Sequence, residues 1–154
     1  MTDSDSAELY QQTKAKALQL LARREHSVGE LKDKLARHCA DQELLDQVLQ
    51  EMLDLRYLSD ERYAEMLLRS RFNRGHGPIR VRQELKQNRV PSEVIQSSFE
   101  AFEEDWYALA REVRERKFGA LPEDYQAKAK QMRFLAGRGF SSDQIEYAFS
   151  NHSD

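Results

Sequence analysis

The chain has 154 residues, a net charge of −3 and a pI near 5.9, and 33% of its residues are charged. Glycine and proline are few and no apolar run is long enough to cross a membrane, so the composition favours a helical protein in water and argues against a membrane span. The single cysteine, Cys39, cannot form an internal disulfide, which fits a reducing compartment, and we expect a cytoplasmic location.

Hydrophobic periodicity and capping residues predict nine helices. Residues 1–6 are expected to form a frayed acidic lead that is unlike a signal peptide, and the first helix should follow over about Ala7–Arg24. Ser27 and Glu30 have the spacing of a capping box, in which each side chain accepts from the backbone N–H of the other. They begin a second predicted helix that runs to about Cys39.

The third and fourth predicted helices begin at Asp41 and Ser59. The third has the clearest apolar stripe at helical spacing: Leu44, Leu45, Val48, Leu49, Met52 and Leu53. The inward residues of the fourth are expected to be Tyr63, Met66, Leu67 and Ser70. A tight turn follows, in which Gly75 suits a left-handed residue just past a helix end and Pro78 suits the first turn of the next helix. That fifth helix should run over Pro78 to about Asn88.

Four further helices complete the prediction. The sixth begins after Pro91, with Val94, Ile95, Phe99 and Phe102 facing inward. The seventh ends at Gly119, the eighth spans about Asp124 to Arg138, and the ninth begins at Ser141. Because valine, isoleucine and threonine are sparse, no sheet is expected and the predicted fold class is all-α.

The chain also repeats itself at a spacing of fifty residues. The aligned sets are Leu35, Leu85 and Leu135; Ala40, Val90 and Phe140; Glu43, Glu93 and Asp143; Leu45, Ile95 and Ile145; and Leu49, Phe99 and Phe149. They are apolar positions expected to face inward, plus an acid in the first turn of every third helix. We therefore predict three tandem three-helix modules at 1–57, 58–104 and 105–154. Gln131 stands where Leu31 and Val81 lie, so the phase of the eighth helix stays open.

A basic strip surrounds the turn between the fourth and fifth predicted helices. Residues 69–89 contain a single acidic residue, Glu84, and the basic residues Arg69, Arg71, Arg74, Arg80, Arg82, Lys86 and Arg89. The chain as a whole is acidic, so these residues form a local positive field, and such a field selects an anionic partner. The low pI argues against a protein that binds duplex DNA with its whole surface. The helix dipole favours cations at a helix end by about 0.3–1 kcal/mol each, which explains one arginine before the turn but not three.

The first module indicates that the scaffold does not require these charges. At the positions of Ile79, Arg80, Arg82 and Lys86 it has Gly29, Glu30, Lys32 and Ala36. An isoleucine in an arginine-lined outward stripe favours a contact surface; the alternative is that Ile79 packs on the first module and the arginines are merely solvated. The predicted partner-binding or DNA-binding residues are Arg69, Arg71, Arg74, His76, Ile79, Arg80, Arg82, Gln83, Lys86 and Arg89.

A three-helix module with a tight turn also invites a helix-turn-helix interpretation. The helix that would enter the major groove, residues 92–100, has no basic residue, and the third helix is strongly acidic. Phosphate contacts from the fourth and fifth helices are therefore expected in place of base reading. No catalytic, metal or cofactor site is expected, because the histidines lack metal-ligand spacing, Gly75-His76-Gly77 is too short for a phosphate-binding loop and Cys39 is typical of a small core residue.

Four segments of the chain match a family pattern. The central pair is Tyr57–Ala64 (YLSDERYA) and Arg74–Leu85 (RGHGPIRVRQEL), and His26–Leu31 (HSVGEL) and Phe134–Phe140 (FLAGRGF) support it. Together they resemble the RecX regulatory proteins over nearly the whole chain. The family usually has an aromatic residue where His76 stands, so no family role is carried over to that side chain.

The resemblance implies three tandem three-helix repeats in an elongated, curved protein without catalytic activity. It implies binding in the groove of the RecA–DNA filament, with suppression of ATP hydrolysis, strand exchange and co-protease activity in DNA repair and the SOS response. The expected partners are the RecA filament and phosphates of single- or double-stranded DNA, contacted by a monomer without a cofactor or a membrane. The alternative that stays open is a DNA-binding protein that acts through phosphate contacts without RecA.

Overall fold

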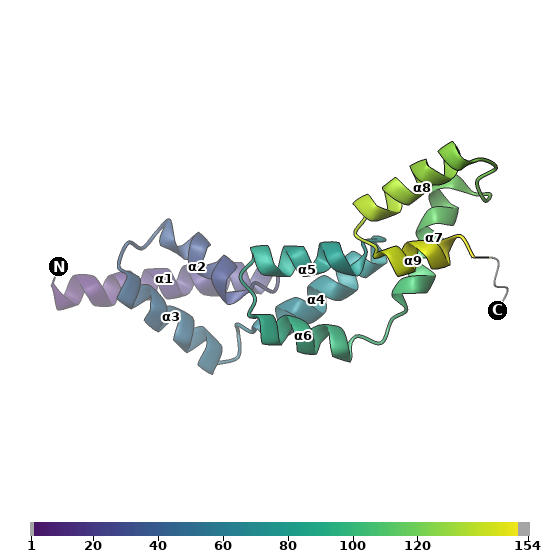
Figure 1. Cartoon of the computed structure of the whole chain (residues 1–154). Helices are drawn as coiled ribbons and strands as arrows, with labels where there is room; N and C mark the ends of the chain where they lie inside the picture. Colours follow the sequence, from purple (N-terminus) through teal and green to yellow (C-terminus); the bar gives the residue numbers. More distant parts are fainter. Residues whose placement is uncertain (1, 151–154) are drawn as a thin grey trace. The chain divides into compact units, whose positions relative to one another are not determined.

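The computed structural model describes residues 2–150, which form nine α-helices and no strand (Figure 1). Met1 of the predicted lead and the last four residues of the predicted third module lie outside this range. The helices are α1 (Asp3–Arg23), α2 (Val28–Ala36), α3 (Gln42–Asp54), α4 (Asp60–Asn73), α5 (Pro78–Gln87), α6 (Ser92–Ala101), α7 (Trp106–Phe118), α8 (Tyr125–Gly137) and α9 (Ser142–Ala148). The predicted all-α class is confirmed. No described helix has the length and apolar character that a membrane span needs.

Contacts divide the chain into two compact units, with boundaries after Met66, Glu84 and Ser98. The first unit contains α1, α2, α3, the beginning of α4 and residues 85–98. The second contains residues 67–84 and the chain from Phe99 onward, including α7, α8 and α9. These units follow packing and not sequence similarity, so the module boundaries at 57/58 and 104/105 stay a prediction.

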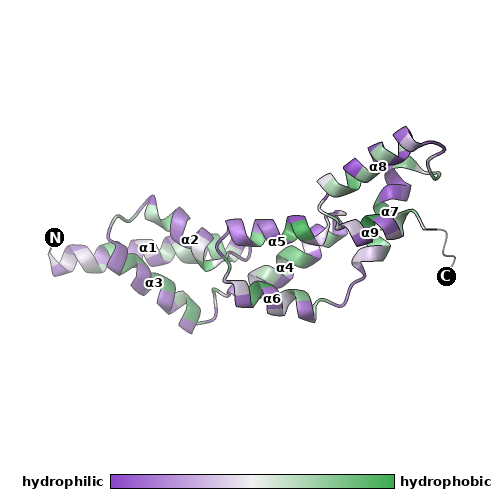
Figure 2. Ribbon diagram, in the orientation of Figure 1, coloured by the Kyte–Doolittle hydropathy of each residue, from purple (hydrophilic) through white to green (hydrophobic). Residues whose placement is uncertain are grey.

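In the first unit, α1, α2 and α3 pack around one apolar core. The green faces of these helices in Figure 2 alternate with purple, as expected for helices that bury one side. The predicted stripe of α3 is confirmed, because the buried core includes Leu44, Leu45, Val48, Leu49 and Met52, with Leu53 packed against them. Cys39 belongs to the same core and is 2% exposed, so its assignment as a small core residue is confirmed.

In the second unit, α7, α8 and α9 pack together at the green-to-yellow end of the chain in Figure 1. Their buried core is Leu109, Ala110, Val113, Leu135, Phe140, Ile145 and Ala148. Arg114 is buried beside it, and its Nε donates to the carbonyl oxygen of Ala148 at 2.8 Å. A guanidinium at the last carbonyl of α9 satisfies a group that the helix leaves unpaired and complements the helix dipole.

The expected beginning of α1 is wrong. The helix begins at Asp3, because Thr2 and Asp5 form a capping box that orders the acidic residues. The Asp5 N–H donates to the Thr2 hydroxyl at 3.1 Å, and the Thr2 N–H donates to the Asp5 carboxylate at 3.4 Å. Acids in the first turn also favour the positive end of the helix dipole.

The predicted capping box of α2 is half correct. The Ser27 hydroxyl accepts from the Glu30 N–H at 3.0 Å, as expected. The Glu30 carboxylate does not return to the cap, because it accepts two hydrogen bonds from the Arg24 guanidinium, at 3.0 and 2.6 Å. The helix ends at Ala36, three residues earlier than predicted.

The fifty-residue repeat is visible in the burial of its aligned positions. Two sets are buried throughout: Leu35, Leu85 and Leu135, and Leu45, Ile95 and Ile145. A third set has one exception, because Ala40 is exposed whereas Val90 and Phe140 are buried, and in the fourth apolar set Leu49 is buried whereas Phe99 and Phe149 are half-buried. The inward assignment of Ala40 is therefore wrong, and the core takes Cys39 in its place because α2 ends early.

Gln131 maintains the repeat through α8. It is 6% exposed, and the equivalent Leu31 and Val81 are fully buried, so the phase that the sequence left open is now established. Among the described residues, its Oε1 is buried and has no hydrogen-bond partner. A polar side chain thus occupies a position that the other two modules fill with apolar ones.

The change Gln131→Leu is expected to raise the free energy of unfolding by about 1–3 kcal/mol, because an unpaired buried polar group costs that much. Urea denaturation followed by circular dichroism measures the difference. The reverse exchange at the equivalent position, Leu31→Gln, is the matched control and should lower the free energy of unfolding. A Gln131→Leu protein less stable than wild type would contradict the assignment of an unpaired amide.

Candidate functional site

The predicted basic strip lies on the end of α4, the following turn and α5. Buried Val81 and Leu85 fix the inward face of α5. Ile79 is 46% exposed, so its predicted outward direction is confirmed, and Arg80 and Lys86 are exposed as well. Of the ten predicted site residues, eight lie in the second unit, and only Lys86 and Arg89 lie in the first.

The turn has the predicted backbone. Gly75 has a φ of +81°, in the left-handed region, and its N–H donates to the Phe72 carbonyl oxygen at 2.9 Å. The N–H of His76 donates to the Arg71 carbonyl oxygen at 3.0 Å, which satisfies another free carbonyl of α4. Pro78 is the first residue of α5, as expected.

Two arginines of the strip bind carboxylates of the chain itself. The Arg71 guanidinium donates to both oxygens of Glu84, at 2.9 and 2.7 Å, and these bonds lower the pKa of Glu84. In the first unit, Arg89 Nη2 donates to Asp33 Oδ1 and to the Gly29 carbonyl oxygen, both at 2.5 Å. Arg71 and Arg89 therefore support the fold, and their charges are partly neutralised.

The remaining cations of the strip differ in how far they are engaged. The Arg82 guanidinium carbon lies 4.3 Å from the centre of the Phe99 ring, a cation–π contact within the second unit. Arg74, Arg80 and Lys86 are exposed, and no carboxylate of residues 2–150 forms an ion pair with them. These three carry the charge that is most accessible to a partner.

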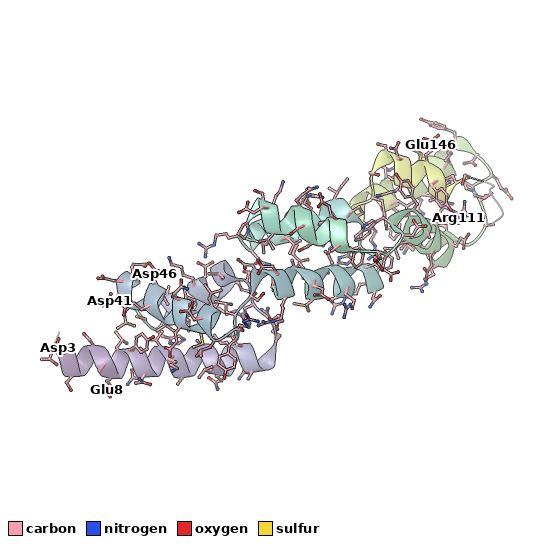
Figure 3. All side chains as sticks on the ribbon, turned by 90° about the horizontal axis from the view of Figure 1, so that it is seen from below. Asp3, Glu8, Asp41, Asp46, Arg111 and Glu146 are labelled. Carbon is pink, nitrogen blue, oxygen red and sulfur yellow. The ribbon has the colours of Figure 1, made fainter. Side chains whose placement is uncertain are left out.

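Acidic side chains of and beside α3 lie on the surface of the first unit. Asp41 and Asp46, labelled in Figure 3, are exposed on the first unit. Two lysines of the first unit pair with acids of this helix, Lys32 with Asp46 at 3.0 Å and Lys14 with Glu51 at 2.7 Å. This region should repel a polyanion.

A residue that the sequence analysis missed, Arg138, joins the site from the end of α8. The N–H of Gly77 donates to the Arg138 carbonyl oxygen at 2.8 Å, and the N–H of Ile79 donates to the Gly139 carbonyl oxygen at 2.9 Å. Gly139 has a φ of +98°, and a Cβ there would lie 2.7 Å from the Arg80 backbone nitrogen. Only glycine fits this approach, which brings Arg138 to the start of α5.

An equivalent joint exists in the first unit, shifted by fifty residues. The Ser27 hydroxyl donates to the Asn88 carbonyl oxygen at 2.7 Å, and Arg89 binds the Gly29 carbonyl oxygen. Ser27 and Asn88 correspond to Gly77 and Arg138. The repeat therefore includes the contacts between neighbouring modules as well as their cores. The spacing of fifty residues indicates which positions of the sequence are equivalent, but it does not indicate which residues contact one another at the joint.

Two histidines occupy equivalent positions at these joints. His26 is buried; its Nδ1 lies 3.0 Å from the Arg24 carbonyl oxygen and its Nε2 lies 3.0 Å from Lys34 Nζ, so Nδ1 donates and Nε2 accepts. His76 is half-buried, and its Nδ1 has no hydrogen-bond partner among the described residues. Burial lowers the pKa of both histidines, and nearby arginines lower that of His76 further.

Stability should therefore fall as the pH falls below about 6.5, the ordinary pKa of histidine. As the pH falls, the unfolded chain binds protons at these histidines before the folded chain does. The contribution of the neutral histidines to the free energy of unfolding is therefore complete above that pH and is lost as the pH falls to the lowered pKa of the folded state. Urea denaturation at about pH 7 and about pH 5.5 measures the loss. Titration of the histidine ring signals by NMR shows whether the two histidines cause this loss. A titration midpoint at or above about 6.5 for both rings in the folded protein would contradict the prediction.

Comparisons with known proteins agree with the resemblance. Three RecX family models match in order: the first three-helix domain at residues 14–52, the second at 59–98 and the third at 103–149. The regulatory protein RecX of Halorhodospira halophila is 43% identical over 133 residues, covering 86% of this chain and 83% of that protein. That of Vibrio campbellii is 43% identical over 139 residues, 90% of each chain.

A solved structure is also similar. The crystal structure of RecX from Lactobacillus salivarius matches with a TM-score of 0.79, 18% identity and coverage of 92% of this chain and 95% of that one. At this identity the likeness concerns the fold alone.

Proposed function

Because this chain belongs to the RecX family of regulatory proteins, we propose that it is a negative regulator of the RecA recombinase. It binds as a monomer in the groove of the cytoplasmic RecA–DNA filament and suppresses ATP hydrolysis, strand exchange and co-protease activity in DNA repair and the SOS response. It acts by binding and not by catalysis, which agrees with the description of its relatives as regulatory proteins.

The observation that carries the proposal is the exposed positive charge around the start of α5. Arg74 and Arg80 are exposed without an intramolecular ion pair in the described chain, and Ile79 is exposed beside them. A filament that carries DNA presents phosphates, and cations steer toward them. The exposed isoleucine adds apolar contact area, which a purely solvated face would not need. The three sequence modules 1–57, 58–104 and 105–154 would serve as successive points of attachment.

The proposal is tested by RecA ATP hydrolysis on single-stranded DNA, measured as this protein is added at rising molar ratio to RecA. Inhibition at ratios far below one molecule per RecA protomer indicates action on whole filaments. Unchanged hydrolysis at equimolar protein would overturn the proposal.

The alternative function, direct DNA binding without RecA, is favoured by the same exposed arginines, because they fit phosphates as well as an acidic protein surface. A gel-shift measurement without recombinase, at about 150 mM salt, separates the two functions. Sub-micromolar affinity under those conditions would favour the alternative. Each phosphate neutralised should steepen the plot of log affinity against log salt by about 0.7–0.9.

A further inference from the structure

We propose that Arg80 and Arg138, together with His76, form a binding site for a phosphate group in the second unit. The site joins the turn before α5, the first turn of α5 and the turn after α8. This inference rests on the proposed function, because Arg80 and His76 belong to the surface assigned there, and it names the chemistry of their ligand. Arg138 is new to that surface.

The backbone places the two arginines next to each other. The two hydrogen bonds from Gly77 and Ile79 to the carbonyl oxygens of Arg138 and Gly139 hold the two turns in direct contact. A Cβ on Gly139 would overlap Arg80, and a Cβ on Gly77 would lie 2.5 Å from the Phe140 nitrogen. The backbone of Arg80 therefore lies directly against the turn that contains Arg138, with no side chain of Gly77 or Gly139 between them.

The charge of these arginines is only partly offset within the described chain. Glu84 is the carboxylate closest to the site in the sequence, and both of its oxygens are occupied by Arg71. Neither Arg80 nor Arg138 forms an ion pair with residues 2–150. The Arg138 guanidinium carbon lies 5.2 Å from the centre of the Phe134 ring, and a ring contact leaves the N–H groups at the guanidinium edge available. Glu84 is the carboxylate that acts on Arg80 and on the His76 ring, and it is shared with Arg71, so a bound anion would offset the positive charge that remains.

His76 supplies an independent observation. Its Nδ1 is buried and unpaired among the described residues, although buried ring nitrogens are normally satisfied. The charged groups that face this ring are Arg71 from α4, Arg80 and Glu84 from α5, and Arg138 after α8. A bound anion would offset the arginines and favour the protonated ring, which could then donate to it.

The equivalent joint in the first unit is an internal control. There His26, Glu30 and Asn88 stand where His76, Arg80 and Arg138 stand in the second unit. Glu30 is paired with Arg24, and both nitrogens of His26 have partners. The first joint therefore forms with a satisfied histidine and without an arginine at the positions of Arg80 and Arg138, so the fold does not require cations at these two positions.

The chemistry of the donors suits phosphate. Guanidinium groups bind the oxygens of phosphate in a bidentate manner and do not lose their charge near neutral pH. The group can come from a nucleic-acid backbone or from a free phosphate. Near neutral pH the backbone phosphodiester has one negative charge and the free ion has between one and two, so the two sources can be compared directly.

The test follows the His76 ring signal of the full chain by NMR, without recombinase. One arm adds inorganic phosphate and the other adds a short oligothymidylate at equal phosphate concentration. We expect the pKa of His76 to rise with ligand, and Arg138→Gln to weaken the response about tenfold or more, as for a charge-assisted hydrogen bond. Arg133→Gln removes an exposed cation of the same helix and is the matched control, with a change of less than about twofold.

Each outcome decides a point. A response to oligothymidylate alone assigns a backbone phosphodiester, and equal responses assign a free phosphate. No response of His76 to either ligand, or equal weakening by both variants, overturns the site. RecA ATP hydrolysis measured with the same preparations separates the two proposals: inhibition without a phosphate response overturns only the site, and a phosphate response without inhibition overturns only the proposed function.

Discussion

Reversal of three charges on α5, by Arg80→Glu, Arg82→Glu and Lys86→Glu, is expected to abolish the inhibition of RecA ATP hydrolysis. A surface that attracts an anionic filament then repels it, because like charges brought together at an interface cost several kcal/mol. Circular dichroism should not change. Stability should fall only slightly, because the contact of Arg82 with Phe99 is worth about 0.5–1 kcal/mol.

The matched control reverses three cations elsewhere, by Lys16→Glu, Arg23→Glu and Arg37→Glu. These residues lie on α1 and after α2, and they form no ion pair in the described chain. The change in net charge is the same, so this variant should still inhibit. Full inhibition by the α5 variant would show that α5 is not the contact, and loss in both variants would assign the effect to net charge.

The change Gly139→Ala is expected to lower the free energy of unfolding by about 2–5 kcal/mol. A left-handed backbone costs a residue with a Cβ about 1–2 kcal/mol, and overpacking adds about 1–3 kcal/mol. Both apply here, because Gly139 has a φ of +98° and its Cβ would lie 2.7 Å from the Arg80 nitrogen. Urea denaturation followed by circular dichroism measures the loss.

Gly137→Ala is the control for this change. Gly137 is the last residue of α8, and a Cβ there would meet nothing within 4 Å. Alanine should therefore stabilise the protein by about 0.5–1 kcal/mol, because it reduces the conformational entropy of the unfolded chain. A Gly139→Ala protein as stable as wild type would mean that the joint to Arg80 is open in solution.

Helices were predicted well because their signals are local. The stripe of α3, the start of α5 at Pro78 and the left-handed Gly75 all depend on neighbours within one or two turns. The predicted start of α1 is wrong although Thr2 and Asp5 have capping spacing, because an acidic composition is typical of a frayed segment as well as of a first helical turn. The fifty-residue repeat was visible because the same joint and core recur.

The state of each charge could not be predicted, because it depends on contacts between distant residues. Arg71 meets Glu84 from another helix, and Arg89 meets Asp33 across 56 residues. In the sequence, Arg71 and Arg89 could not be distinguished from Arg80 as residues free to bind a partner. Arg138 was missed for the same reason, since its place beside Arg80 is set by backbone hydrogen bonds to Gly77 and not by any local pattern.

The contact surface on α5 is tested most directly by the affinity of the labelled protein for preassembled RecA–DNA filaments. Wild type is compared with the variant that combines Arg80→Glu, Arg82→Glu and Lys86→Glu, at one salt concentration. We predict a loss of at least about 100-fold for this variant, equal to about 2.7 kcal/mol, and a change of only a few-fold for the control reversal on α1 and α2. Equal affinities of wild type and the α5 variant would contradict a role for this surface in filament binding.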